Sequence, residues 1–259
     1  MLSTPLCALL GIEHPVLNAP MSGTATAELA AAVSLAGGFG MLGGSSAGGA
    51  DWLRAQIRAA RSGVDVVIAQ GTEAGGHTGQ AGTLALLPAV VDAVGDIPVV
   101  AAGGIADGRG LAAVLLLGAS GGWLGTRFVA SAEWGGAAQD QQAVLAAGAD
   151  DTVRTTVYDQ VRGAPFPEGI ADRVLRNAFT SAWEGRTGDI AARQAELRRE
   201  LEEAAEQGDP TVVDISAGVA VGLISSLEPA GAIVQRIVEE TERVLRERVA
   251  LLLREAPHR

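Results

Sequence analysis

Short apolar runs alternate with helical segments over the first half of the chain. Strand-like runs, most of which end near glycine, occupy residues 15–21, 39–42, 64–69, 97–102 and 122–129. Segments of helical composition or spacing lie between them, at residues 24–36, 51–61, 83–94 and 108–117. Because no hairpin turn joins the strands, this order predicts parallel βαβ crossovers and an α/β fold with five recognisable βα units.

The pattern changes beyond Ser131, where helical and irregular segments replace the strands. A charged helix is predicted from Asp189, which could cap it, to Gln207, and Gly208 follows it. A last helix over residues 229–253 has an apolar side that we expect to pack back on the first part. The predicted organisation is a barrel-like domain at 1–131, packed by 229–259, and a helical second domain at 132–228.

Composition narrows the functional classes. The formal charge is −11 and every cationic side chain is arginine, a balance that disfavours nucleic acid as a partner. The single cysteine, Cys7, cannot form an internal disulfide, and the N-terminus lacks the basic region of a signal peptide, so we expect a cytoplasmic protein. The uncharged stretch at 29–50 is interrupted by glycine pairs, which argues against a membrane span.

Ligands of parallel α/β folds bind at the carboxyl ends of the strands, so the loops there are the candidate sites. Gly103-Gly104-Ile105 and Gly125-Thr126-Arg127 follow or end consecutive strands. Bare backbone N–H groups in such loops suit a phosphate cradle, although glycine pairs also serve simply as tight turns.

His77 is the candidate catalytic side chain. It lies in the sequence AQGTEAGGHTG, residues 69–79, at the carboxyl end of a predicted strand. An imidazole has a pKa suited to a general base near neutral pH, and Glu73 could orient it. The alternative is an ordinary surface histidine. One cysteine and three separated histidines offer no metal-ligand spacing, and GxSxG and Walker motifs are absent from the sequence.

Four motifs together resemble the nitronate monooxygenase (2-nitropropane dioxygenase) family: LNAPMSG, AQGTEAGGHTG, VVAAGGIADGRG and WLGTRF. VLRNAF and AGVAVGLI resemble parts of that family's helical second domain. The resemblance implies a TIM-barrel (βα)8 fold, bound FMN, and oxidation of alkyl nitronates with molecular oxygen. The implied partners are therefore a small-molecule nitronate and O2.

The resemblance also implies roles for individual residues. Met21 would contact the flavin through its backbone, Gln70 and Gly75 would bind the ring and ribityl region, and Gly103 with Gly104 would meet the phosphate. Trp123, Leu124, Gly125 and Thr126 would close the phosphate cradle. His77 would take the α-proton of a neutral nitroalkane or steady an anionic nitronate. FMN-dependent enoyl-acyl-carrier-protein reductases carry a similar GGH loop and are the alternative activity.

The sequence departs from the family between Arg61 and Val64, where a helix runs directly into the strand that bears Gln70. About three βα units, with a family asparagine that binds FMN, are missing there. The incomplete, TIM-barrel-like sheet could close more tightly, stay open, or be completed by another chain, and exposed edges favour homo-oligomers. A truncated flavin binder without catalysis is therefore a further alternative.

Overall fold

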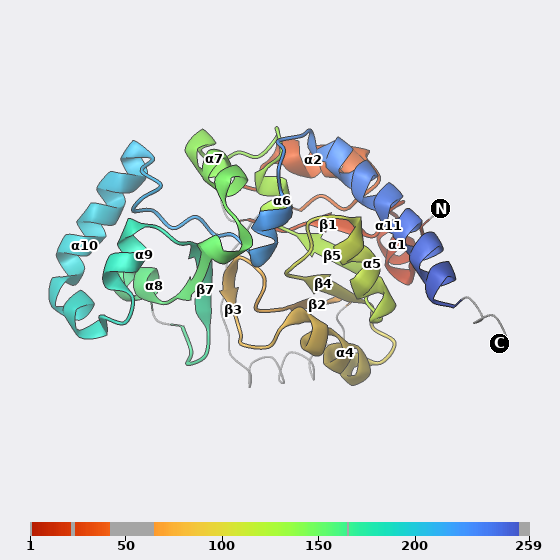
Figure 1. Ribbon diagram of the computed structural model, residues 1–259, viewed down its shortest axis with the longest axis horizontal. Coiled ribbons are helices and arrows are strands. Elements are labelled where there is room, and N and C mark those ends of the chain that lie inside the picture. Colours follow the sequence, from red (N-terminus) through yellow and green to blue (C-terminus); the bar gives the residue numbers. More distant parts are fainter. Residues whose placement is uncertain (1, 22–23, 42–64, 165, 254–259) are drawn as a thin grey trace, which may run out of the picture.

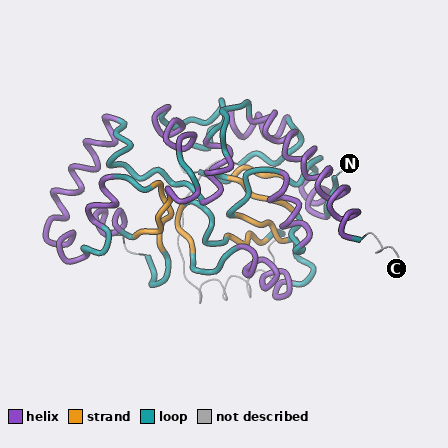
Figure 2. The backbone as a smooth tube through the Cα atoms, viewed as in Figure 1, coloured by secondary structure: helices purple, strands orange, loops and turns teal. Residues whose placement is uncertain are grey.

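The structure is a computed structural model in which residues 2–21, 24–41, 65–164 and 166–253 are described (Figure 1). A parallel sheet with helices packed against it forms one region. A second region, rich in helices, surrounds a small antiparallel sheet (Figures 1 and 2). Among the described residues, no helix combines the length and apolar character needed to cross a membrane.

The parallel sheet has the strand order β1-β5-β4-β2. Its strands are β1 (Val16–Asn18), β5 (Gly121–Leu124), β4 (Val99–Ala102) and β2 (Val67–Gln70). Leu17 also forms a parallel bridge to Phe39, which places that segment on the edge of β1 opposite β5. Within the described residues, no pairing connects Phe39 to β2, so the tighter closed sheet does not form there. The prediction of an incomplete TIM-barrel-like fold is confirmed.

Helices cover one face of this sheet. They are α2 (Ala27–Leu35), α4 (Thr83–Val94), α5 (Gly108–Leu116) and α11 (Ala230–Leu252). Ile233 and Ile237 of α11 are buried in the same core as Leu29 of α2 and Leu111 of α5, which holds the end of the chain against the barrel strands. The spacing of these apolar residues on α11 explains why it packs along one side.

A short helix that the sequence analysis did not anticipate, α1 (Pro5–Leu10), packs on the other face of the sheet. Proline at its first position has a fixed φ suited to a helix start, and Gly11 ends it with a left-handed φ of 66°. Leu6 is fully buried with Leu17 and Val100.

One predicted strand is shorter than expected, and one predicted helix lies outside the described residues. The strand expected over residues 122–129 ends at Leu124, and Thr126–Val129 forms the helical turn α6. The break falls at Gly125, whose backbone is already α-like. The helix expected at 51–61 lies outside the described residues.

The second region contains strands that the sequence analysis missed. β6 (Thr152–Thr155) and β7 (Ala171–Leu175) form an antiparallel sheet with β3 (Gly76–Thr78). The helical elements around it are α7 (Ala138–Ala146), η1 (Ala149–Asp151), α8 (Val157–Arg162), α9 (Ala178–Trp183), α10 (Thr187–Gln207) and η2 (Val219–Leu223). Since β3 follows directly from the loop after β2, the antiparallel sheet links the two regions. The domain boundaries at 131/132 and 228/229 remain predictions.

The long helix α10 begins two residues before the predicted Asp189, at Thr187, and ends at Gln207 as predicted. Its N-cap is Arg186, and Asp189 lies in the first turn, where it accepts a 2.9 Å hydrogen bond from Arg186 Nε. Gly208 ends the helix with φ 66°.

Candidate functional site

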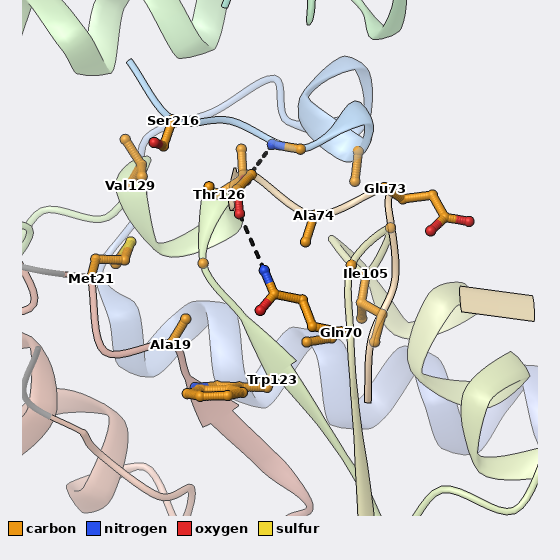
Figure 3. A pocket seen from close by; sticks show the side chains of 18 of the residues that line it. Ala19, Met21, Gln70, Glu73, Ala74, Ile105, Trp123, Thr126, Val129 and Ser216 are labelled. Carbon is orange, nitrogen blue, oxygen red and sulfur yellow. Dashed lines mark hydrogen bonds between the residues drawn. The ribbon is translucent and has the colours of Figure 1, made fainter. Parts of the chain in front are cut away.

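A cavity of about 470 Å³ lies at the carboxyl ends of the parallel strands. Loops after β1, β2, β4 and β5 line it, together with a segment from the second region (Figure 3). The predicted cofactor residues that line the cavity are Met21, Gln70, Gly75, Gly103, Gly104, Trp123, Gly125 and Thr126. The strand-end rule thus brings together residues that lie more than a hundred positions apart in the sequence.

Leu124 and His77 are the two predicted site residues outside the cavity lining. Leu124 is 1% exposed and its side chain packs in the barrel core. Its carbonyl oxygen accepts a hydrogen bond from the Ala19 N–H, which ties β5 to the loop after β1. Leu124 therefore supports the loops around the cavity from the core side of the sheet.

The glycine loop after β4 has a backbone that only glycine adopts freely. Gly103 has φ 100° and Gly104 has φ 77°. A Cβ on Gly103 would come within 2.9 Å of the Ala74 backbone nitrogen, whereas a Cβ on Gly104 would meet only the Glu73 side chain, at 3.6 Å. The loop is therefore packed tightly at Gly103 and open at Gly104.

Backbone N–H groups are available where these loops meet. Those of Gly104, Gly125 and Thr126 donate to no acceptor in the described part of the chain. A Cβ on Gly125 would touch Ala19 Cβ at an ordinary 3.5 Å. Unpaired amides beside glycine leave room for the close approach of an anion, as a phosphate cradle requires.

Glu73 anchors the glycine loop instead of orienting His77. Its carboxylate accepts hydrogen bonds from the Thr83 backbone N–H, at 2.8 and 3.0 Å, and from Thr83 Oγ1 at 2.9 Å. Thr83 Oγ1 lies 3.1 Å from the Gly103 carbonyl oxygen. Glu73 thus provides a hydrogen-bond acceptor for the Thr83 N–H at the start of α4, and through Thr83 it holds the loop after β4. The prediction that Glu73 orients His77 is wrong.

Gln70 and Trp123 extend from the ends of their strands into the cavity (Figure 3). Gln70 Nε2 lies 3.5 Å from the Gly75 carbonyl oxygen, so the amide remains largely available to a ligand. The Trp123 indole is fixed because its Nε1–H donates to the Asn18 carbonyl oxygen at 2.8 Å. One side chain offers polar contacts and the other a rigid apolar wall.

Met21 and Gly75 also make contacts within the protein that hold the loops around the cavity in place. The Met21 N–H donates to the Ala19 carbonyl, and the Met21 carbonyl accepts from Thr24 and Ala25. A Cβ on Gly75 would lie 2.8 Å from the backbone of Ala217. The glycine at position 75 is therefore required for the contact between the barrel loop and the second region.

His77 lies on β3 beside the second region. Its Nε2 is 2.9 Å from Asp159 Oδ1 of α8, and its ring stacks on Phe166 with centroids 3.7 Å apart. Its side chain is 29% exposed. Gly75 and Gly76, the residues just before it, line the cavity. His77 is therefore adjacent to the cavity and is held by residues that the sequence analysis did not select.

The carboxylates around His77 determine its charge. Burial lowers the pKa of His77, but the hydrogen bond that the ring donates to Asp159 and the negative charges of Asp172, Asp159 and Asp214 outweigh burial and raise this pKa above its ordinary value. The surrounding carboxylates therefore stabilise the imidazolium form of His77 relative to a free histidine.

Residues of the second region complete the cavity. Asp140, Asp214, Ser216 and Trp134 line it, and all lie beyond Ser131. Burial, followed by the charge of Asp214, raises the pKa of the Asp140 carboxyl. No sequence motif marked these residues, because their position depends on how the second region folds back on the barrel. In the described residues there is no group of three metal-ligating side chains.

Comparison with known proteins identifies relatives of this chain. The chain is 39% identical over 201 residues to a nitronate monooxygenase, npaC, of Metarhizium robertsii, a match that covers 73% of this chain and 55% of the relative. A Neurospora crassa nitronate monooxygenase is 36% identical over 197 residues, with 50% of the relative covered. The chain thus spans about half the length of the curated relatives it matches.

Among solved structures, FabK from Thermotoga maritima superposes with a TM-score of 0.80 at 29% identity. This match covers 97% of this chain and 100% of that chain.

The family model for nitronate monooxygenase matches residues 3–63 and 58–240. The two matched parts meet at the position where the sequence analysis places the missing βα units, and together they include every predicted site residue. The chain therefore belongs to the nitronate monooxygenase family.

Proposed function

We propose that this chain binds FMN in the cavity and oxidises alkyl nitronates with molecular oxygen, with His77 as the proton-handling side chain. The main support is that eight predicted cofactor residues, in the loops at the ends of β1, β2, β4 and β5, line one cavity. Family membership supports the same activity.

The cavity fits FMN in its polar and apolar parts. The unpaired amides of Gly104, Gly125 and Thr126 suit the phosphate, while Gln70 and Trp123 suit the ribityl chain and the ring. The buried Trp134 Nε1–H lines the cavity and has no partner among the described residues, so it offers one more donor. When bound, FMN supplies the redox chemistry that takes electrons from the substrate and passes them to oxygen.

His77 contributes in one of two ways, set by the substrate form. As an imidazolium, favoured by its raised pKa, it stabilises a bound anionic nitronate. As a neutral imidazole it accepts the α-proton of a neutral nitroalkane. Nitroalkane turnover should therefore increase as pH rises through the pKa of His77, because only the neutral ring can accept a proton.

An oxygen electrode tests this function. Purified protein supplied with FMN should consume oxygen with propyl-2-nitronate, and His77→Asn should lose nitroalkane oxidation more severely than nitronate oxidation. A His77→Asn variant that oxidises nitroalkanes at the wild-type rate would remove the proposed role of His77. FMN binding without oxygen consumption would instead favour a non-catalytic flavin binder.

An enoyl-acyl-carrier-protein reductase is the second candidate. The GGH loop at residues 75–77 favours it, and the superposition on FabK extends over the whole of that chain. Such a reductase requires NAD(P)H, whereas nitronate oxidation does not. NADH oxidation that depends on an enoyl thioester would therefore support this alternative, and its absence would favour nitronate oxidation.

Location and assembly belong to the same proposal. We propose a cytoplasmic location, since the single cysteine, Cys7, cannot form an internal disulfide. Copies are proposed to associate through sheet edges, since the side of β2 away from β4 has no strand among the described residues. Light scattering after gel filtration measures the assembly directly, and a monomer at micromolar concentration would contradict it.

A further inference from the structure

Two elements of the second region hold the imidazole of His77. Asp159 on α8 forms the 2.9 Å contact with Nε2, and Phe166 stacks on the ring with an interplanar angle of 13°. The Asp159 side chain is only 8% exposed, so water competes weakly for this hydrogen bond. The ring is therefore fixed at one edge and across one face.

Asp172 faces His77 from the neighbouring strand. The two residues are directly opposite each other in the antiparallel pair of β3 and β7. Side chains at opposite positions of such a pair lie on the same face of the sheet, with Cβ atoms about 5 Å apart. Asp172 is 4% exposed and its Oδ1 has no hydrogen-bond partner in the described structure. A buried carboxyl thus lies next to the imidazole.

The charged groups near His77 are mostly negative. Asp159 and Arg162 come from α8, Asp172 from β7 and Asp214 from the segment before η2. Arg162 forms a bidentate ion pair with Asp214, at 2.5 and 2.7 Å, which neutralises that carboxylate locally. Asp159 and Asp172 are therefore the two carboxyl groups whose negative charge a protonated His77 would neutralise.

We propose that Asp159 is a positioning residue for His77, which fixes the Nε2 edge and leaves Nδ1 to exchange protons with the substrate, while Asp172 stabilises the protonated ring. Nδ1 makes no hydrogen bond within the described residues and is not among the buried unsatisfied atoms. The inference deepens the proposed function and rests on it for the identity of the substrate.

The proton transfer balances without a further reagent. The substrate's α C–H bond breaks, an N–H bond forms at Nδ1, and the electron pair of the broken bond moves into the nitro group to give the nitronate. His77 gains one positive charge, which Asp159 stabilises through the hydrogen bond to Nε2. Asp159 itself keeps its charge throughout, so its contribution is orientation and electrostatic balance.

NMR titration of the imidazole tests this assignment without any requirement for activity. The chain has three histidines, so His14 and His258 serve as internal references. Asp159→Asn keeps the shape of the side chain but removes its charge, and it should lower the pKa of His77 alone. Asp172→Asn should lower it without removing the hydrogen bond. The exposed Asp150→Asn is the matched control and should leave His77 unchanged.

Kinetics provide the second readout. In Asp159→Asn the rising limb of the pH profile of kcat/KM for a nitroalkane should move to lower pH, and the plateau should fall about 10- to 100-fold, as expected for a displaced base. Asp159→Glu, which restores the charge on a longer arm, should recover part of the loss and should raise the pKa of His77 back toward the wild type.

The outcomes separate this inference from the proposed function. A folded Asp159→Asn protein whose His77 titrates as in the wild type would overturn the inference, whatever the activity. Should wild-type protein lack nitroalkane oxidation while Asp159→Asn still shifts the His77 titration, the proposed activity fails and the pairing of Asp159 with His77 stands.

Discussion

Substitution of Gly104 by alanine tests the phosphate cradle and the conformational argument together. Gly104 has φ 77°, and an alanine Cβ there would meet only the Glu73 side chain, with Cβ at 3.6 Å and Cγ at 3.9 Å. The steric cost is therefore small, and the expected loss is the left-handed conformational penalty of about 1–2 kcal/mol. For a chain of this size that penalty lowers Tm by roughly 2–8 °C.

The effect on FMN should exceed the effect on stability. If the alanine relaxes away from this φ, the Gly104 N–H leaves its position beside the cavity. A hydrogen bond to a charged group contributes about 1.5–3 kcal/mol, so the Kd for FMN should rise about 10- to 100-fold. Titration of the protein with FMN, followed by quenching of flavin fluorescence, measures this change.

Gly11→Ala is the matched control. Gly11 has φ 66°, a Cβ there would meet nothing within 4 Å, and the residue does not line the cavity. It should lose similar stability and keep the wild-type affinity for FMN. Equal FMN affinity of Gly104→Ala and Gly11→Ala would contradict a role of the Gly104 N–H in binding. Wild-type stability of both variants would contradict the conformational penalty.

Three further substitutions test the surroundings of the site. Burial raises the pKa of Asp172 to about 6, so the folded state binds more protons than the unfolded state between about pH 4 and 6, and stability falls as pH rises through that window. Asp172→Asn should therefore stabilise the protein by up to about 3 kcal/mol above pH 6 and leave it little changed below pH 4, and equal gains in urea unfolding at both pH values would contradict this. Glu73→Ala should cost about 1–2 kcal/mol by removing the cap of α4, without changing the NMR titration of His77; a shifted titration would restore Glu73 as its orienting group. Gly75→Ala should cost about 1–3 kcal/mol because its Cβ would overlap the Ala217 backbone, whereas Gly79→Ala, with open space around it, should be nearly neutral; a thermal melt that ranks them otherwise would refute the packing argument.

The barrel half of the fold could be predicted from the sequence because its signals are local. The helix at Thr83–Val94 agrees with its prediction, and the glycines after β4 lie where the chain needs positive φ. Parallel strands place their carboxyl ends at one edge, so the loops with Gly104 and Thr126 could be assigned to one site from strand order. Gln70 was assigned to the same site through the family resemblance, and it also lines the cavity.

The second region and the surroundings of His77 could not be predicted in the same way. β6 (TVRT) and β7 (ADRVL) are short and carry charged residues, so they lack the apolar pattern of the barrel strands. Asp159 lies 82 positions from His77, and the two meet only in the folded protein, where α8 contacts β3 through this hydrogen bond. Glu73 was the nearby acidic residue and was selected for that reason, but the start of α4 uses its carboxylate.

Titration of the wild-type protein with FMN tests the central claim most directly. A chain of this length with the cavity intact should bind FMN saturably at one site per chain, show the flavin absorption bands after gel filtration, and then consume oxygen with propyl-2-nitronate. Protein that retains no flavin absorption after FMN addition would contradict the account.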